Sequence, residues 1–138
     1  MKRLVPLLAL CALLFAGCSS LDTHQAADYS HVRRIFVEHR QTDNHHIDEL
    51  IVAELKSRGY DASCGWPTMM PDTTEAIISY EDRWQWDFNS YLIDLNLQLR
   101  ANFTDKPLAH GHYHQASAAT KSPANVVREI VDPLFKKL

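Results

Sequence analysis

The chain has 138 residues, of which 46% are hydrophobic and 22% charged, and this length suits a single domain. A net charge of −3 argues against a protein that binds nucleic acid or anionic lipid through a basic surface. The three cysteines do not make the even set that would indicate a disulfide framework.

The first residues have the order of an export signal. Lys2 and Arg3 give a positive start, and an apolar run follows over residues 4–15. Because this run contains Pro6 and is shorter than the roughly 20 residues of a membrane-spanning helix, we predict a cleavable signal peptide over residues 1–17. Its removal takes two of the 14 basic residues, so the mature chain keeps 12 basic against 17 acidic residues, a net charge of −5.

The residues at the end of this signal, Phe15-Ala16-Gly17-Cys18, resemble the lipobox of bacterial lipoproteins, with Phe15 where Leu is usual. The resemblance implies that cleavage occurs before Cys18 and that this cysteine carries diacylglycerol and a further acyl chain such as palmitate. At about 0.8 kcal/mol per buried methylene, two or three chains hold a protein at a membrane permanently. The alternative is an ordinary secreted protein with a cysteine at this position.

The residue after the cysteine bears on the location. In lipoproteins of this kind an Asp at that place retains the protein at the inner membrane, and this chain has Ser19 there. The resemblance therefore implies a lipid-anchored protein at the periplasmic face of the outer membrane of a Gram-negative bacterium. We expect it to contact the membrane through lipid and to have a protein partner in the envelope, but not to bind nucleic acid.

The residues that follow the cysteine are polar and show no hydrophobic period. We therefore predict a lipidated cysteine and flexible tether over residues 18–30 and a single domain over residues 31–138. At about 3.3 Å per residue the tether would reach at most ~40 Å from the anchor. Cys64 has no intramolecular partner once Cys18 takes lipid and the third cysteine leaves with the signal. We expect a small buried side chain at Cys64, the alternatives being an intermolecular bridge and a reactive thiol.

The domain begins with a strand and a helix. Residues 32–39 are rich in β-branched and aromatic side chains, which predicts a strand. A capping signal at Asp43 and Asn44 precedes apolar residues at helical spacing, and Gly59 marks the helix end. Residues 60–64 fit a short strand, which a loop with two prolines follows.

Two long alternating runs come next, at residues 76–86 and 91–102, with residues 87–90 as the turn of an antiparallel hairpin. The predicted apolar face of the hairpin consists of Ala76, Ile78, Tyr80, Trp84 and Trp86 in the first run and Tyr91, Ile93, Leu95, Leu97 and Leu99 in the second. The other face of the second run carries polar side chains, Asp94 among them.

The end of the chain predicts one more strand and one more helix. Residues 107–118 fit a strand that pairs back on the hairpin, and Ser122 caps a final helix with Pro123 at its first position. Pro133 should kink this helix. With the short strand of residues 60–64 left out, the order β-α-β-β-β-α predicts an α+β fold, a two-layer sandwich with a mainly antiparallel sheet and two helices on one face.

Residues 80–92 contain the most distinctive pattern of the chain, Tyr-x3-Trp-x-Trp-Asp-x3-Tyr-Leu. It resembles a motif of a group of small, uncharacterised proteobacterial lipoproteins, and the likeness extends over most of the mature chain. The resemblance implies a lipoprotein with this order of elements and no established activity.

Trp84 and Trp86 share one side of the predicted hairpin, because strand residues two apart point to the same face. We expect both indoles to lie in the core under the helices. The alternative is an exposed aromatic platform that stacks on a sugar ring, which would make the protein a glycan-binding module.

His110, His112 and His114 alternate along one strand, so their imidazoles point to one face, with neighbouring Cβ atoms roughly 7 Å apart. Together with Asp94 of the adjacent strand, such a set can bind Zn or Cu. We expect a solvated polar face, with metal binding and pH sensing as the alternatives.

Motifs of catalysis do not occur in the sequence. It has no nucleophile elbow, phosphate loop, His-Glu-x-x-His helix or Cys-x-x-Cys pair. We therefore predict no catalytic residue, no resident cofactor and a protein that is not an enzyme. The leading hypothesis is a membrane-anchored interaction or envelope-assembly module, and the alternatives are a periplasmic metal-binding protein and a glycan-binding module.

Overall fold

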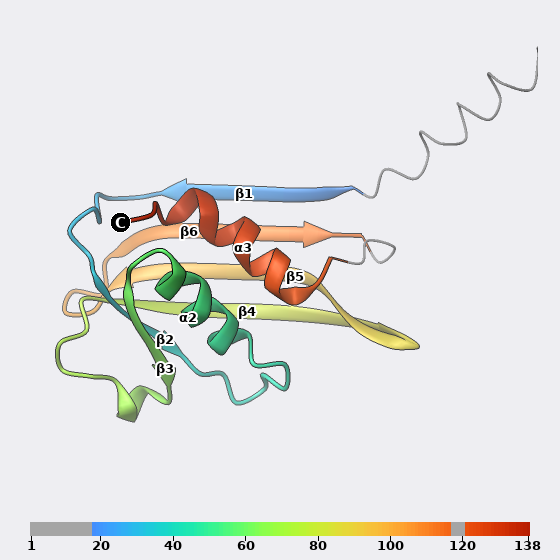
Figure 1. Ribbon diagram of the computed structural model, residues 1–138, viewed down its shortest axis with the longest axis horizontal. Coiled ribbons are helices and arrows are strands. Elements are labelled where there is room, and N and C mark those ends of the chain that lie inside the picture. Colours follow the sequence, from blue (N-terminus) through green and yellow to red (C-terminus); the bar gives the residue numbers. More distant parts are fainter. Residues whose placement is uncertain (1–17, 117–120) are drawn as a thin grey trace, which may run out of the picture.

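The computed structural model describes residues 18–116 and 121–138, and Figure 1 shows how its elements are arranged. In chain order they are β1 (Ser19–Gln25), β2 (Arg34–Glu38), α2 (Ile47–Ser57), β3 (Asp61–Gly65), the short 3-10 helix η2 (Pro67–Met69), β4 (Ala76–Asp87), β5 (Asn89–Ala101), β6 (Pro107–Gln115) and α3 (Pro123–Leu134). The predicted signal peptide lies outside the described residues. Within them, no helix is both long enough and apolar enough to cross a membrane.

The six strands form one sheet in the order β1-β6-β5-β4-β2-β3. Neighbouring strands are antiparallel except for β2, which is parallel to both β3 and β4. The helix α2 forms the crossover between the parallel strands β2 and β3, and both helices cover one face of the sheet (Figure 1). The predicted α+β class, with its mainly antiparallel sheet and two helices on one face, is confirmed.

The residues that follow Cys18 form an edge strand. β1 pairs with β6 along its whole length, beginning with Ser19 opposite Gln115, and the amide of Ala116 donates to the carbonyl oxygen of Cys18 at 3.3 Å. Nearly all side chains of β1 are exposed, so backbone hydrogen bonds and not apolar burial hold the strand in place. The predicted flexible tether is therefore wrong for residues 19–25, and the folded domain begins directly after Cys18.

A bulge in the β4–β5 hairpin changes which residues of β5 face the core. The register shifts between Arg83 and Trp84, so that β5 has one more residue than β4 at this point. The core side chains of β5 are Leu92, Leu95, Leu97 and Leu99. The prediction of a core side chain is therefore wrong at Tyr91, which is only partly buried, and Ile93 at the bulge lies outside the main core cluster.

The helix α3 packs closely against β6. A Cβ atom at Gly111 would lie 2.8 Å from Cγ1 of Ile130, so a glycine is required at this point of the strand. The side chain of Ser122 accepts a backbone hydrogen bond at the start of α3, as predicted. Pro133 lies in the last turn, and the helix ends at the next residue, Leu134.

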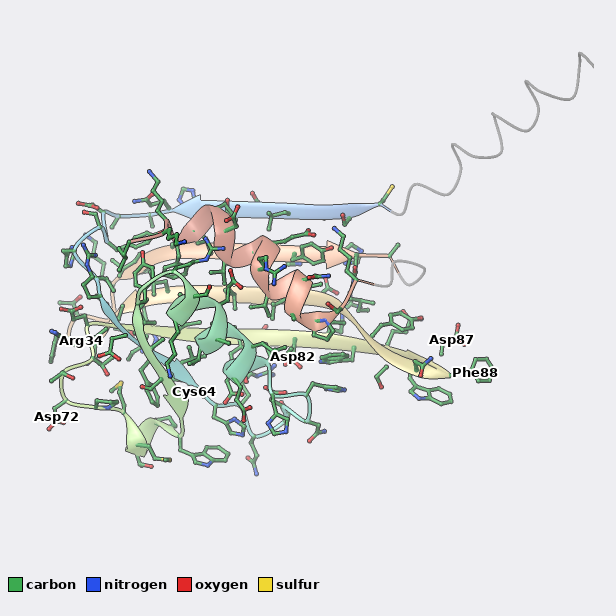
Figure 2. The ribbon with its side chains drawn as sticks, viewed as in Figure 1. Arg34, Cys64, Asp72, Asp82, Asp87 and Phe88 are labelled. Carbon is green, nitrogen blue, oxygen red and sulfur yellow. The ribbon has the colours of Figure 1, made fainter. Side chains whose placement is uncertain are left out.

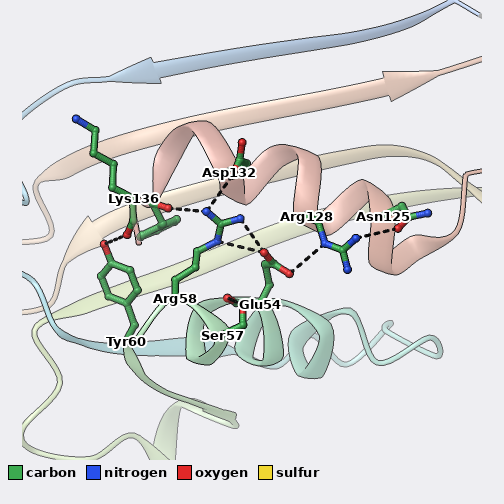
Figure 3. A network of polar contacts seen from close by, with 9 residues as sticks. Glu54, Ser57, Arg58, Tyr60, Asn125, Arg128, Asp132 and Lys136 are labelled. Atoms are coloured by element: carbon green, nitrogen blue, oxygen red, sulfur yellow. Dashed lines mark hydrogen bonds and ion pairs between the residues drawn. The ribbon is translucent and has the colours of Figure 1, made fainter. Parts of the chain in front are cut away.

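Arg58 connects α2 to α3 and to the end of the chain (Figure 3). Its guanidinium contacts the Glu54 carboxylate at 2.7 Å, the Asp132 carboxylate at 3.1 Å and the carbonyl oxygen of Phe135 at 2.9 Å. The side chains of Arg58 and Glu54 are only 12% and 15% exposed, so the charge-assisted hydrogen bonds between these two residues are shielded from solvent, whereas Asp132 is exposed. Gly59 follows with a φ of 97°, which confirms the predicted end of the helix.

Candidate functional site

The open face of the sheet, opposite the helices, carries the three predicted histidines. Residues along β6 alternate between buried and partly exposed, and His110, His112 and His114 are among the partly exposed ones. Gly111 between them faces Ile130 of α3, which places the imidazoles on the opposite face.

Asp94 on β5 connects two of these histidines. Its Oδ1 atom lies 3.2 Å from Nε2 of His112 and 2.8 Å from Nδ1 of His114. Its Oδ2 atom accepts a hydrogen bond from Nε of Arg83 at 2.6 Å, and a second guanidinium nitrogen contacts the same oxygen. The sequence indicated the carboxylate next to the histidines, whereas it did not indicate Arg83.

Asp94 is held in its ionised form. Burial alone would raise the pKa of this carboxyl, but its hydrogen bonds with His114, Arg83 and His112 outweigh burial, and the pKa lies below the usual value. The carboxylate is therefore charged at neutral pH and forms an ion pair with the guanidinium of Arg83. A metal ion bound here would have to overcome the positive charge of Arg83.

His110 has different neighbours. In the sheet it lies beside Gln98 of β5 on one side and His24 of β1 on the other. The structure therefore brings together only part of the predicted ligand set. Asp94 contacts His112 and His114, whereas His110 lies beside Gln98 and His24. His24 joins this face through β1, a strand that its polar sequence did not indicate.

Within residues 18–116 and 121–138, one set of three side chains brings possible metal-ligand atoms within 4.8 Å of one another, namely Asp43, His45 and Asp82. Asp43 accepts hydrogen bonds from the amides of His45 and Ile47 at 2.8 and 2.7 Å, so its side chain satisfies the first amide of α2. The N-cap residue is His46, whose side chain makes no capping hydrogen bond, so the cap predicted at Asp43 and Asn44 is wrong in position. Asp43 also accepts from the Tyr80 hydroxyl at 2.7 Å. Burial and this bond raise the pKa of Tyr80, so its hydroxyl remains the donor.

Asp82 is equally well satisfied. It accepts from a guanidinium nitrogen of Arg40 at 2.5 Å and from the indole nitrogen of Trp84 at 2.6 Å. The ring of His45 stacks on Trp84 with centroids 3.5 Å apart. A metal ion would have to displace these donors, so this cluster fits a structural role in fastening the start of α2 to β4.

The two predicted aromatic residues have different surroundings. Trp84 packs against the core and is covered on one ring face by His45. Trp86 is 71% exposed, and its ring lies 6.2 Å from that of Phe88 at the tip of the hairpin. The expectation of a core position is wrong for Trp86, and a glycan-binding platform of both indoles stays a prediction.

His39, Asp48 and Cys64 lie together near the start of α2, and the sequence did not indicate this cluster. Nδ1 of His39 lies 2.8 Å from Oδ2 of the buried Asp48, and Trp66 packs edge-on against the imidazole at 4.7 Å. Cys64 is partly buried beside them, and burial together with the charge and hydrogen bond of Asp48 raises the pKa of its thiol to about 11. This thiol faces a carboxylate and stays protonated at neutral pH, so it is not arranged as a nucleophile.

No protein-family model matches the sequence, and no curated protein does. The fold is similar to that of the PelC dodecamer from Paraburkholderia phytofirmans, which two structures match at a TM-score of 0.63 and 8–9% identity over 88% of this chain and 100% of that chain. A PDZ domain protein from Parabacteroides distasonis matches at a TM-score of 0.50 and 10% identity, over 92% of this chain and 38% of that chain. A minor lipoprotein from Acinetobacter baumannii matches at 14% identity over 75% of this chain and 84% of that chain, but its TM-score of 0.33 supports no argument. At these identities the likenesses show the fold alone.

Proposed function

We propose that this chain is a lipoprotein of the bacterial envelope, anchored through Cys18 at the periplasmic face of the outer membrane, whose domain is a non-enzymatic interaction or assembly module. The observation that carries the proposal is the position of Cys18, which is exposed and directly precedes β1. Lipid on this residue would hold the folded domain at the membrane surface without a spacer. A domain held there acts on components in or next to the membrane.

The open face of the sheet supports the interaction role. It presents the histidines of β6 together with Asp94 and Arg83, so that charged and hydrogen-bonding groups extend over three neighbouring strands. Partly exposed polar groups of this kind suit the rim and the hydrogen bonds of a protein interface. The likeness in fold to PelC, a dodecamer, is an analogy that makes self-association the first interaction to test.

Crosslinking in intact envelopes tests this proposal. We expect the full-length protein to give reproducible adducts with a second copy or with another envelope protein. Arg83→Glu should weaken the adducts because it reverses the charge beside Asp94, whereas Lys106→Glu, an exposed charge reversal in the β5–β6 turn, should not. Adducts no stronger than those of an unrelated lipoprotein would count against an assembly role.

A periplasmic metal-binding protein is the second candidate function. It is favoured by Oδ1 of Asp94, which lies within 3.2 Å of nitrogens of both His112 and His114. Calorimetric titration with Zn²⁺ and Cu²⁺ tests it, with His112→Ala as the disabling variant and His110→Ala as the matched control. If no ion binds more tightly than about 10 µM, which corresponds to about 7 kcal/mol, this function is eliminated.

A further inference from the structure

The tip of the β4–β5 hairpin exposes two large aromatic side chains. Trp86 is 71% and Phe88 is 87% exposed, and their ring centroids are 6.2 Å apart. The hairpin extends beyond the neighbouring strands, and Phe88 lies at its far end (Figure 2). Aromatic side chains this exposed contribute almost nothing to the core, so packing within the domain does not explain them.

The backbone at Phe88 is also unfavourable for a phenylalanine. Its φ of 61° lies in the left-handed region, which glycine, asparagine and aspartate adopt far more readily than bulky residues. A turn selected for stability alone would have one of those residues at this position. Neither local conformation nor packing accounts for Phe88, and this points to a contact outside the domain.

The tip and Cys18 lie at the same end of the sheet. Ser20 of β1 is beside His114, which is beside Asp94, which in turn is beside Arg83 of β4. From this row of four residues, Cys18 is reached by following β1 toward its first residue, and the tip is reached by following β4 toward its last residue. The two directions are the same, and Figure 1 shows the start of β1 and the hairpin tip at one end of the sheet. At about 3.3 Å per residue the tip passes Cys18 by roughly 10 Å, and three strand spacings of about 4.8 Å separate the two sideways.

We propose that the tip formed by Trp86 and Phe88 inserts into the interfacial region of the membrane that holds the Cys18 lipids, as a second and non-covalent membrane contact. This inference rests on the proposed lipidation of Cys18. Lipid chains attached there would enter the bilayer close to the tip, so insertion needs no rearrangement of the domain. The two contacts fix the orientation of the domain, with the helices and the histidine face both directed sideways.

The chemistry of the tip fits a lipid surface. An indole keeps its ring in the apolar region and its N–H among the headgroups, which is why tryptophan is enriched at membrane interfaces. Residues 84–91 carry one charged side chain, Asp87, and no basic one. Insertion therefore does not depend on anionic lipid, and zwitterionic vesicles at any salt concentration are suitable partners.

Quenching of tryptophan fluorescence by brominated lipid tests the proposal. The mature lipidated protein is placed in zwitterionic phosphatidylcholine vesicles that carry bromine on acyl carbons near the headgroups. We expect quenching in the wild type, loss of most of it in Trp86→Phe, and a clear decrease in Phe88→Ser. Trp66→Phe is the matched control, because Trp66 is also exposed, at 46%, but lies away from the tip. It follows β3, which pairs with β2, and β2 pairs only with the first residues of β4, up to Ile78.

The outcomes separate this inference from the proposed function. Mass spectrometry first establishes whether Cys18 carries acyl chains, and a missing acyl mass overturns both the anchor and the insertion. If the acyl mass is present but Trp86→Phe is quenched as strongly as the wild type, insertion is wrong and the anchor stands. A crosslink from position 86 to a second protein copy, without lipid quenching, would identify the tip as a protein interface and overturn the proposal. Matching unfolding curves for the variants exclude a folding defect as the cause.

Discussion

Oδ1 of Asp94 lies 2.8 Å from Nδ1 of His114 on the neighbouring strand, while Arg83 on the other neighbouring strand holds the second oxygen of the same carboxylate. The contact connects β4, β5 and β6 near the end of the sheet where Cys18 lies. It belongs to the polar face that the helices leave open, where Asp94 is buried and its partners Arg83 and His114 are partly exposed.

Replacing Asp94 should produce a stability loss that depends on pH. We expect Asp94→Asn to lower the free energy of unfolding by about 1 kcal/mol at pH 7, because the partners of the carboxylate are partly exposed. The pKa of Asp94 is lower in the folded than in the unfolded protein, so its contribution is present above about pH 4 and is lost as the pH falls through the folded value.

Urea unfolding at neutral and acid pH measures this effect. The difference between the wild type and Asp94→Asn should shrink toward zero in acid, whereas the effect of Gln98→Ala on the same strand should not change in this way. A difference for Asp94→Asn that is constant over the whole range would show that its charge does not stabilise the fold.

Gly111→Ala should loosen the packing of α3 on the sheet. The added methyl group would lie 2.8 Å from Cγ1 of Ile130, and overpacking of this kind typically costs about 1 to 3 kcal/mol. Ile130→Ala makes room for the methyl group, so the double variant should lose less stability than the sum of the two single variants. Strictly additive losses in equilibrium unfolding would mean that the two side chains do not collide.

Phe88→Asn should stabilise the soluble domain and weaken its contact with lipid. Asparagine adopts the φ of 61° more readily than phenylalanine, and we expect a gain of about 0.5 to 1 kcal/mol in the free energy of unfolding. Thermal unfolding measures the gain, and vesicle flotation measures the contact. A variant that is less stable than the wild type would show that Phe88 is needed for the fold, contrary to the external contact inferred for it.

Cys64 should react slowly with alkylating reagents in the folded protein. Its thiol pKa is raised from 9.0 to about 11, which lowers the thiolate fraction at neutral pH roughly a hundred-fold. The rate of iodoacetamide labelling should rise steeply only above pH 10. Asp48→Asn removes the neighbouring charge and should shift this rise to lower pH, and fast labelling of the wild type at pH 7 would contradict the raised pKa.

The sequence was sufficient for the elements that bury an apolar stripe or use a strong cap. The helix after Ser122 begins as predicted, because its capping side chain is recognisable from residue type and position. The helix α2 follows from the helical spacing of Ile47, Ile51 and Leu55, which are buried. The strands predicted over residues 76–86 and 91–102 are present as β4 and β5, because alternation shows their buried face. Asp87 and Asn89 belong to these strands, so the turn predicted over residues 87–90 is too long. The common face of His110, His112 and His114 follows from the same alternation.

The remaining features depend on contacts that leave no hydrophobic pattern. β1 consists of exposed polar residues and is held by backbone hydrogen bonds to β6, so periodicity cannot reveal it. The bulge after Arg83 adds one residue to β5, and sequence alternation does not reveal it. Because of the bulge, Leu92 and not Tyr91 points into the core. The ion pair of Asp94 with Arg83 joins neighbouring strands, and the pair of His39 with Asp48 joins the end of β2 to α2. Both depend on strand register and side-chain packing, which residue type alone does not reveal.

The mass of the N-terminal peptide of the protein purified from membranes tests the central claim most directly. The account predicts a peptide that begins at Cys18 and carries the mass of a diacylglycerol and a further acyl chain on that residue. A peptide that continues from residue 17 into Cys18, or one that begins with an unmodified Cys18, would contradict the anchor on which the proposed function rests.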